Sequence, residues 1–270
     1  MKRYHVLDGI RGITLCSMIL YHVVWDLVYI FDYNWDWYRS DFAYVWQQSI
    51  CWCFILLSGF CFSLGKRKVR RGLIVFGAGA LVSFVTHITM PGQSVSFGVL
   101  TMLGSSMLLM ACFEKIYKEI GQQIDTGGVE KTHLKNDDKN IRAYSGMAVF
   151  FSFFCFLITR GINERYLGFE EIYLFKLPDT LYQNGNLMTY IGFMSEDFYS
   201  TDYFSMIPWF FLFLTGYFLF HWMKSRGTLD ILKTMTCFSR FFCFIGKRSL
   251  IIYLIHQPIA YTILAIFNKI

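Results

Sequence analysis

Apolar residues dominate long stretches of the chain, and short polar segments separate these stretches. Each apolar stretch is about twenty residues long, which is enough for a helix to cross the hydrocarbon core of a bilayer. A backbone inside a bilayer must satisfy its own hydrogen bonds, so each stretch is expected to be an α-helix. The pattern therefore predicts an all-α fold, a polytopic membrane helix bundle that forms a single domain over 1–270. Seven transmembrane helices are predicted, at residues 9–31, 42–64, 72–90, 96–114, 143–160, 203–223 and 248–268.

Two of the polar connections are unusually long. The segment "GQQIDTGGVEKTHLKNDDKN" at 121–140 has low hydrophobicity and mixed charge, which is typical of a mobile linker. The segment 161–202 contains many Tyr, Phe, Leu and acidic residues, and it is too long for a bare connector. We expect 161–202 to form a partly helical outer loop or lid over a site that faces outward.

The composition supports the membrane assignment and narrows the class of partner. The 270 residues are 55% hydrophobic and only 16% charged, which is too little charge to cover the surface of a soluble domain. The net charge of +6 comes from Lys and Arg in short loops, without the basic face that nucleic-acid binding requires. The eight cysteines show neither metal-site spacing nor a disulfide pattern, so no metal site and no disulfide framework are expected.

The distribution of basic residues predicts the orientation. If the N-terminus is cytoplasmic, the cytoplasmic side holds 19 of the 25 Lys and Arg residues, the opposite side holds five, and Arg11 lies inside the first helix. The positive-inside rule favours this arrangement and places the C-terminus outside. The first apolar stretch is long, contains charges and lacks a cleavage site, so it is expected to be a retained helix.

The first predicted helix carries four ionisable residues within the apolar run "LDGIRGITLCSMILYHVVWD" at 7–26. At 100° per residue, Arg11 and His22 lie about 20° apart around the helix. Asp8 and Asp26 fall within about 60° of them. Exposure to lipid would be costly for each group, so the stripe is expected to face the inside of the bundle.

His22 is the residue of this stripe best suited to chemistry. It lies about 16 Å along the helix from Arg11, near the predicted bilayer midplane. A neutral imidazole is the least costly ionisable group to bury there, and it can exchange a proton near pH 7. Asp26, one turn further, could hold the tautomer of His22 and stabilise its protonated form. We interpret the stripe as a functional site; the alternative is a set of hydrogen bonds that only join helices.

Other polar residues are predicted at membrane depth or at the outer mouth of the bundle. The last apolar stretch, "GKRSLIIYLIHQP", places His256 and Gln257 deep in the bilayer. The segment "TDYFSMIPWFF" places Asp202 and Tyr203 at the outer mouth and Trp209 just inside it. Aromatic residues at such positions more often belong to the interfacial belt or to helix packing than to a ligand site.

Four segments resemble a known family in sequence and in order: "LDGIRG" followed by His22, "FGVLTMLG", "DYFSMIPWFFLFLTGY" and "IGKRSLIIYLIHQP". They are similar to bacterial relatives of the catalytic domain of heparan-α-glucosaminide N-acetyltransferase. The spacing of Arg11 and His22 also resembles the first helix of the broader transmembrane acyltransferase group. The resemblance implies transfer of an acetyl or other acyl group from cytoplasmic acyl-CoA, such as acetyl-CoA, to a sugar amine or hydroxyl across the membrane. It also implies glycan modification at a bacterial cytoplasmic membrane, by a protein whose oligomeric state stays open.

The resemblance further suggests roles for two residues. It implies that His22 is the central catalytic group and that Arg11 organises the acyl-donor side. From the residues themselves we add the hypothesis that Asp26 or His256 assists His22 and that basic residues of the cytoplasmic loops bind the CoA phosphates. Direct transfer and a route through acyl-histidine both stay open. The expected donor-side residues are Asp8, Arg11, Arg70, Arg71, Lys247 and Arg248, and the expected acceptor-side residues are Asp202, Tyr203, Trp209 and Gln257.

Two other functions are compatible with the same residues. Buried Asp, Arg and His also form proton relays, so a proton-coupled small-molecule transporter is one alternative. The chain shows no repeated halves and no pair of broken helices, which many transporters have. The second alternative is a non-catalytic membrane partner of an envelope enzyme. The resemblance implies a catalytic histidine in the stretch after the first helix and a histidine at position 101 in many relatives, whereas here the segment 31–37 has no histidine and position 101 is Thr.

Overall fold

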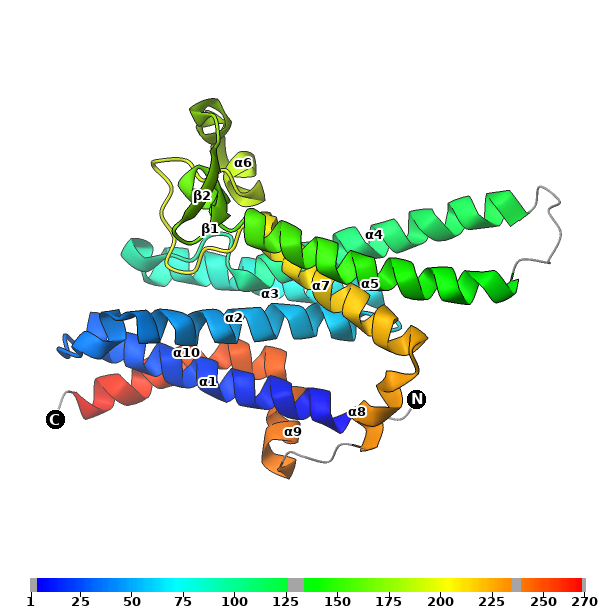
Figure 1. Ribbon diagram of the computed structural model, residues 1–270. Helices are drawn as coiled ribbons and strands as arrows, with labels where there is room; N and C mark the ends of the chain where they lie inside the picture. Colours follow the sequence, from blue (N-terminus) through cyan, green and yellow to red (C-terminus); the bar gives the residue numbers. More distant parts are fainter. Residues whose placement is uncertain (1–3, 126–133, 235–238, 269–270) are drawn as a thin grey trace. The chain divides into compact units, whose positions relative to one another are not determined.

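The computed structural model of the protein describes residues 4–125, 134–234 and 239–268, except the side chains of 118, 120–125 and 134–143. Seven helices among these residues are long and apolar enough to cross a membrane, which confirms the predicted all-α membrane fold. They are α1 (His5–Tyr29), α2 (Asp41–Phe62), α3 (Lys68–Thr89), α4 (Val99–Asp125), α5 (Leu134–Ile158), α7 (Met206–Ser225) and α10 (Ser249–Phe267) (Figure 1).

The chain folds as two compact units. The first unit comprises Met1–Leu57 and Gly227–Ile270, and the second comprises Ser58–Arg226. The first unit contains α1, most of α2 and α10. Its described residues also form four short helical segments: the 3-10 helices Asp36–Arg39 and Thr228–Asp230, and the helices α8 (Ile231–Thr234) and α9 (Arg240–Lys247).

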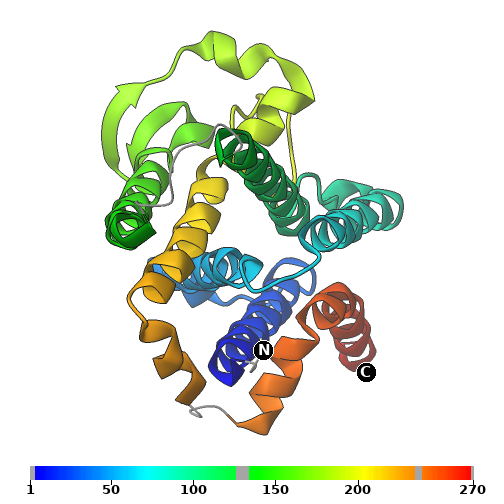
Figure 2. The ribbon, with the colours of Figure 1, turned by 90° about the vertical axis from the view of Figure 1, so that its right-hand side faces the viewer.

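In the first unit, α9 packs crosswise against α1 at two glycines (Figures 1 and 2). A Cβ on Gly246 would lie 1.8 Å from the backbone oxygen of Asp8, and a Cβ on Gly12 would lie 2.0 Å from that of Phe242. Only glycine permits this approach of one backbone to the other. The sequence predicted a loop here, because an eight-residue helix is too short to show a clear periodicity.

In the second unit, α3 packs against α4 and α5 packs against α7. A hydrogen bond of 3.0 Å between the hydroxyls of Ser152 and Thr215 joins α5 to α7. Thr215 is the donor of this bond, and the Ser152 hydroxyl donates in turn to the backbone oxygen of Ala148 one turn earlier in α5, so these polar groups are satisfied inside an apolar contact.

The segment predicted as an outer lid contains two strands that the sequence did not predict. The antiparallel strands β1 (Tyr166–Phe169) and β2 (Ile172–Lys176) form a hairpin, with a bulge at Leu167/Gly168. The 3-10 helix Asp179–Gln183 and the helix α6 (Gly185–Ile191) follow, so the segment is partly helical. Strands of four and five residues are too short to separate from a loop by alternation alone.

The predicted linker 121–140 is helical at both of its ends. The helix α4 continues to Asp125, and α5 begins at Leu134. Residues 126–133, the middle of that linker, lie outside the described residues.

Candidate active site

Two histidines from distant parts of the sequence meet in the first unit. The ring centroids of His22 on α1 and His256 on α10 are 5.1 Å apart, with an interplanar angle of 56°. The Nδ1 atom of His256 lies 2.5 Å from the backbone oxygen of Tyr253. A carbonyl oxygen can only accept, so Nδ1 carries a proton and Nε2 of the neutral ring has the free lone pair.

Asp26 lies one turn beyond His22, on the same face of α1, because residues four apart are stacked along a helix. Its side chain is completely buried, and its Oδ1 atom accepts a hydrogen bond of 2.7 Å from Nε2 of Gln257. The structure therefore brings together His22, Asp26, His256 and Gln257. The bond from Gln257 to Asp26 was not predicted, since a sequence does not specify how α1 and α10 face each other.

Three buried atoms of this site have no hydrogen-bond partner among the described residues: Oδ2 of Asp26, Nε2 of His256 and Oε1 of Gln257. All three are acceptors, given the tautomer of His256 and the bond that Gln257 donates. Leaving a buried polar group unpaired costs about 1–3 kcal/mol, so proteins rarely do so without a reason. The site therefore suits a bound molecule that offers N–H or O–H donors.

The beginning of α1 carries the predicted donor-side residues of the first unit. Nη1 of Arg11 lies 3.4 Å from Oδ1 of Asp8, which is buried where Gly246 of α9 crosses α1. Lys247 is the last residue of α9 and Arg248 follows it, and both are exposed. The contact between α1 and α9 thus gathers three cations and one buried carboxylate at the end of α1 that precedes His22.

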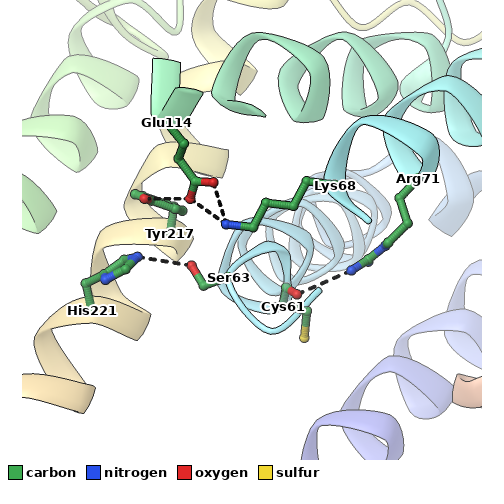
Figure 3. A network of polar contacts seen from close by, with 7 residues as sticks. All are labelled: Cys61, Ser63, Lys68, Arg71, Glu114, Tyr217 and His221. Atoms are coloured by element: carbon green, nitrogen blue, oxygen red, sulfur yellow. Dashed lines mark hydrogen bonds and ion pairs between the residues drawn. The ribbon is translucent and has the colours of Figure 1, made fainter. Parts of the chain in front are cut away.

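The other two predicted donor-side arginines lie in the second unit, in the first turn of α3. Arg70 is exposed. Arg71 is half-buried, and its Nη1 atom donates to the backbone oxygen of Cys61 at 3.5 Å, near the end of α2 (Figure 3). Arg71 therefore supports the turn between α2 and α3.

The predicted acceptor-side residues of the second unit make contacts within the fold. Asp202 accepts a hydrogen bond from the backbone N–H of Val99 at the start of α4, and burial raises the pKa of this carboxyl to about 6. The hydroxyl of Tyr203 donates to the backbone oxygen of Thr189 at 2.5 Å. Trp209 is buried and packs against other aromatic rings. Tyr203 and Trp209 thus make packing and hydrogen-bond contacts within the protein, as is common for aromatic residues near the membrane interface.

The second unit also holds a polar network that sequence reasoning missed (Figure 3). Nζ of Lys68 on α3 lies 2.5 Å from both carboxylate oxygens of Glu114 on α4, and the hydroxyl of Tyr217 on α7 donates to the same carboxylate at 3.0 Å. Nε2 of His221 lies 3.2 Å from Oγ of Ser63. An acidic residue at the end of an apolar run is the signal that would have identified Glu114, because such a charge requires a partner.

The comparison with protein families decides the class of this protein. The family model for the catalytic region of heparan-alpha-glucosaminide N-acetyltransferase matches residues 3–122 and 142–258. The chain belongs to this family. No curated protein and no solved structure matches the chain.

Membership in the heparan-alpha-glucosaminide N-acetyltransferase family confirms the predicted resemblance and indicates a membrane acetyltransferase. The family uses acetyl-CoA in general. Both matched segments contribute to the site in the first unit: His22 and Asp26 lie in the first segment, and His256 and Gln257 lie in the second. The residues that meet there are therefore part of the region that defines the family.

Proposed function

We propose that this protein transfers an acetyl group from acetyl-CoA to an amine or hydroxyl of a sugar, with the donor and the acceptor on opposite sides of the membrane. The observation that carries the proposal is the set of three unpaired acceptor atoms, on Asp26, His256 and Gln257, beside the ring of His22. An amino sugar carries several N–H and O–H donors, so it can satisfy these atoms.

The residues of the site can manage the proton that such a transfer releases. His22 takes the proton from the acceptor amine or hydroxyl as its nitrogen or oxygen bonds to the thioester carbonyl carbon. The carbon–sulfur bond then breaks, and the proton passes from His22 to the departing thiolate. Nε2 of His256 has a free lone pair and can accept the proton in place of His22. The carboxylate of Asp26 lies one turn from His22 on α1 and is bonded to Gln257, and a negative charge at this position favours a protonated imidazole. His22 thus ends the reaction in its starting state, and the transfer needs neither an oxidant nor a reductant.

The beginning of α1 fits the donor side of the reaction. CoA carries phosphate groups, and guanidinium and ammonium groups bind phosphates well. Arg11, Lys247 and Arg248 supply such groups within one unit. The distance from Arg11 to His22 along α1 is about 16 Å, which an extended pantetheine arm can span. The N-terminal end of α1 is the cytoplasmic end in this proposal, because most basic residues lie on that side.

The proposal is tested by incubating the purified protein with labelled acetyl-CoA and a panel of amino sugars and neutral sugars. We expect label in an N- or O-acetylated sugar, with CoA released in equal amount. Acetyl-CoA should also raise the melting temperature, because a ligand that binds only the folded state stabilises it. Release of CoA without acetylated sugar, or no thermal shift by acetyl-CoA, would contradict the proposal.

A further inference from the structure

The strand β2 exposes an uninterrupted run of large apolar side chains. Ile172, Tyr173, Leu174 and Phe175 are each between 61% and 70% exposed. Side chains alternate between the two faces of a strand, so both faces of β2 are apolar and open. Proteins rarely leave such a patch in water, and one of this kind marks a binding surface.

The hairpin has a fixed conformation, so this exposure is not that of a loose loop. Two backbone hydrogen bonds of 3.2 Å join Gly161 to β1, one to Gly168 and one to Tyr166. The hydroxyl of Tyr166 also donates to the backbone oxygen of Glu170 at 2.6 Å, across the turn of the hairpin. Arg165 forms ion pairs of 3.2 Å and 2.7 Å with Asp179 and Glu196 and so ties the base of the hairpin to the following segment.

The position of the hairpin identifies what covers the patch. The helix α5 ends at Ile158, and the candidate membrane span that contains it reaches Glu164, two residues before β1 begins. Figures 1 and 2 show the hairpin running crosswise to α5 and α7 from the end of α5, and not onward along the helix axes. A segment that leaves a spanning helix sideways at its end lies at the level of the membrane surface.

The helix that precedes the hairpin also has an exposed apolar surface. Met147, Phe150, Phe151 and Phe154 on α5 are all exposed, as expected for a surface in contact with lipid. The run Ile172–Phe175 is a second exposed apolar surface, and it follows the end of this helix in the chain. Tyr and Phe beside a span are typical of the interfacial layer, where their rings lie at the level of the lipid headgroups.

We propose that the hairpin is a membrane-surface anchor, with Ile172–Phe175 inserted into the interfacial layer of the leaflet at that end of α5. The backbone limits the depth of insertion. The described sheet has two strands, so the outer edge of β2 needs water or headgroups for its N–H and C=O groups. Glu170 and Glu171 at the turn are exposed and remain among the headgroups or in water. This inference does not depend on acetyl transfer.

The test is photo-crosslinking of the full chain in phosphatidylcholine vesicles, with Phe175 replaced by the photo-reactive p-benzoylphenylalanine. We expect the main product to be an adduct with phosphatidylcholine. In this background Leu174→Asp should lower the lipid adduct about fivefold, which corresponds to about 1 kcal/mol for a charge at the interface. Leu187→Asp is the matched control, because Leu187 is equally exposed, at 68%, but lies on α6 outside the hairpin; it should leave the adduct yield unchanged.

Three other results would overturn the proposal. Crosslinking between two copies of the chain would show that β2 pairs with a second strand, as exposed strand edges can do. If the protein with the probe at Phe175 forms neither a lipid adduct nor a crosslink to a second copy, the hairpin does not rest on lipid. The same conclusion follows if Leu174→Asp and Leu187→Asp lower the yield of the lipid adduct equally.

Discussion

The rings of His22 and His256 lie 5.1 Å apart, although 233 residues separate the two positions in the sequence. The short contact between Nδ1 of His256 and Tyr253 fixes where one ring carries its proton. Within the described part of the chain, the His22 ring makes no such hydrogen bond to a backbone carbonyl. The two rings therefore differ in environment, which suits the proposed reaction, in which one ring first accepts a proton and then returns it.

The charge of Asp26 and its hydrogen bond can be separated by mutation. In Asp26→Asn the side-chain oxygen can still accept the bond from Gln257, but the negative charge is lost. We expect the melting temperature to change little and the acetyl-transfer rate to fall about tenfold to a hundredfold, because a protonated histidine loses its nearby anion.

Asp26→Ala is the comparison. It removes the acceptor and leaves the buried amide of Gln257 unpaired, so it should cost stability as well, by about 1–3 kcal/mol. Equal rates in Asp26→Asn and the wild type would show that the carboxylate has no electrostatic role. Both quantities come from thermal melts and initial rates of the purified variants.

The crossing of α1 and α9 is expected to fail when a side chain is added at Gly246. Its Cβ would lie 1.8 Å from the backbone oxygen of Asp8, so Gly246→Ala must push the helices apart. We expect a lower melting temperature and a higher KM for acetyl-CoA, because Arg11 on α1 then moves away from Lys247 and Arg248 at the end of α9.

Gly77→Ala is the matched control, since a Cβ at Gly77 meets no atom within 4 Å. It should raise the helix stability by about 0.5–1 kcal/mol and leave KM unchanged. A KM for acetyl-CoA that is unaffected by Gly246→Ala would remove the α1–α9 contact from the donor side.

The ion pair between Lys68 and Glu114 should contribute to the stability of the second unit. Both side chains are largely buried, at 23% and 18% exposed, so Glu114→Ala leaves the Lys68 charge without its carboxylate partner. We expect a loss of about 1–3 kcal/mol in unfolding free energy, less than for a fully buried pair. Glu119→Ala, which removes an exposed pair with Lys115 on the same helix, should have no measurable effect in the same thermal melts. Equal effects of the two substitutions would contradict a structural role for the network.

Asp202 should make stability depend on pH in an unusual direction for a carboxyl. Burial raises its pKa from 3.8 to about 6, so the folded state binds the proton more tightly than the unfolded state. This contribution to stability is complete below pH 3.8 and is lost as the pH rises through about 6. The difference in melting temperature between the wild type and Asp202→Asn should therefore shift against the wild type between pH 4 and pH 7. A difference that stays constant over this range would show that Asp202 is solvated.

The spanning helices and the stripe on α1 could be predicted because they depend on local features. Lipid requires long apolar helices, and helical geometry alone places His22 and Asp26 on one face. The partners of that stripe could not be predicted, because the pairing of α1 with α10 depends on tertiary packing. Gln257 was expected near a substrate, and its bond to Asp26 appears only in the structure.

Short elements and paired charges were harder to predict. The helix α9 and the strands of the hairpin are too short to produce a clear period. Glu114 and Lys68 are far apart in the sequence, and nothing local shows that they pair. The basic positions Lys247 and Arg248 were expected in a loop, whereas Lys247 ends α9 and Arg248 follows it.

The most direct test of the account is acetyl transfer across vesicles that contain the protein in one orientation. Labelled acetyl-CoA is supplied on the side of the α1 N-terminus, and the amino sugar identified with the wild type is supplied on the other side. We expect labelled sugar with the wild type, a loss of at least about a hundredfold with His22→Ala, and wild-type activity with His87→Ala, which changes an exposed histidine on α3. Transfer by a folded His22→Ala variant at the wild-type rate would contradict the central claim.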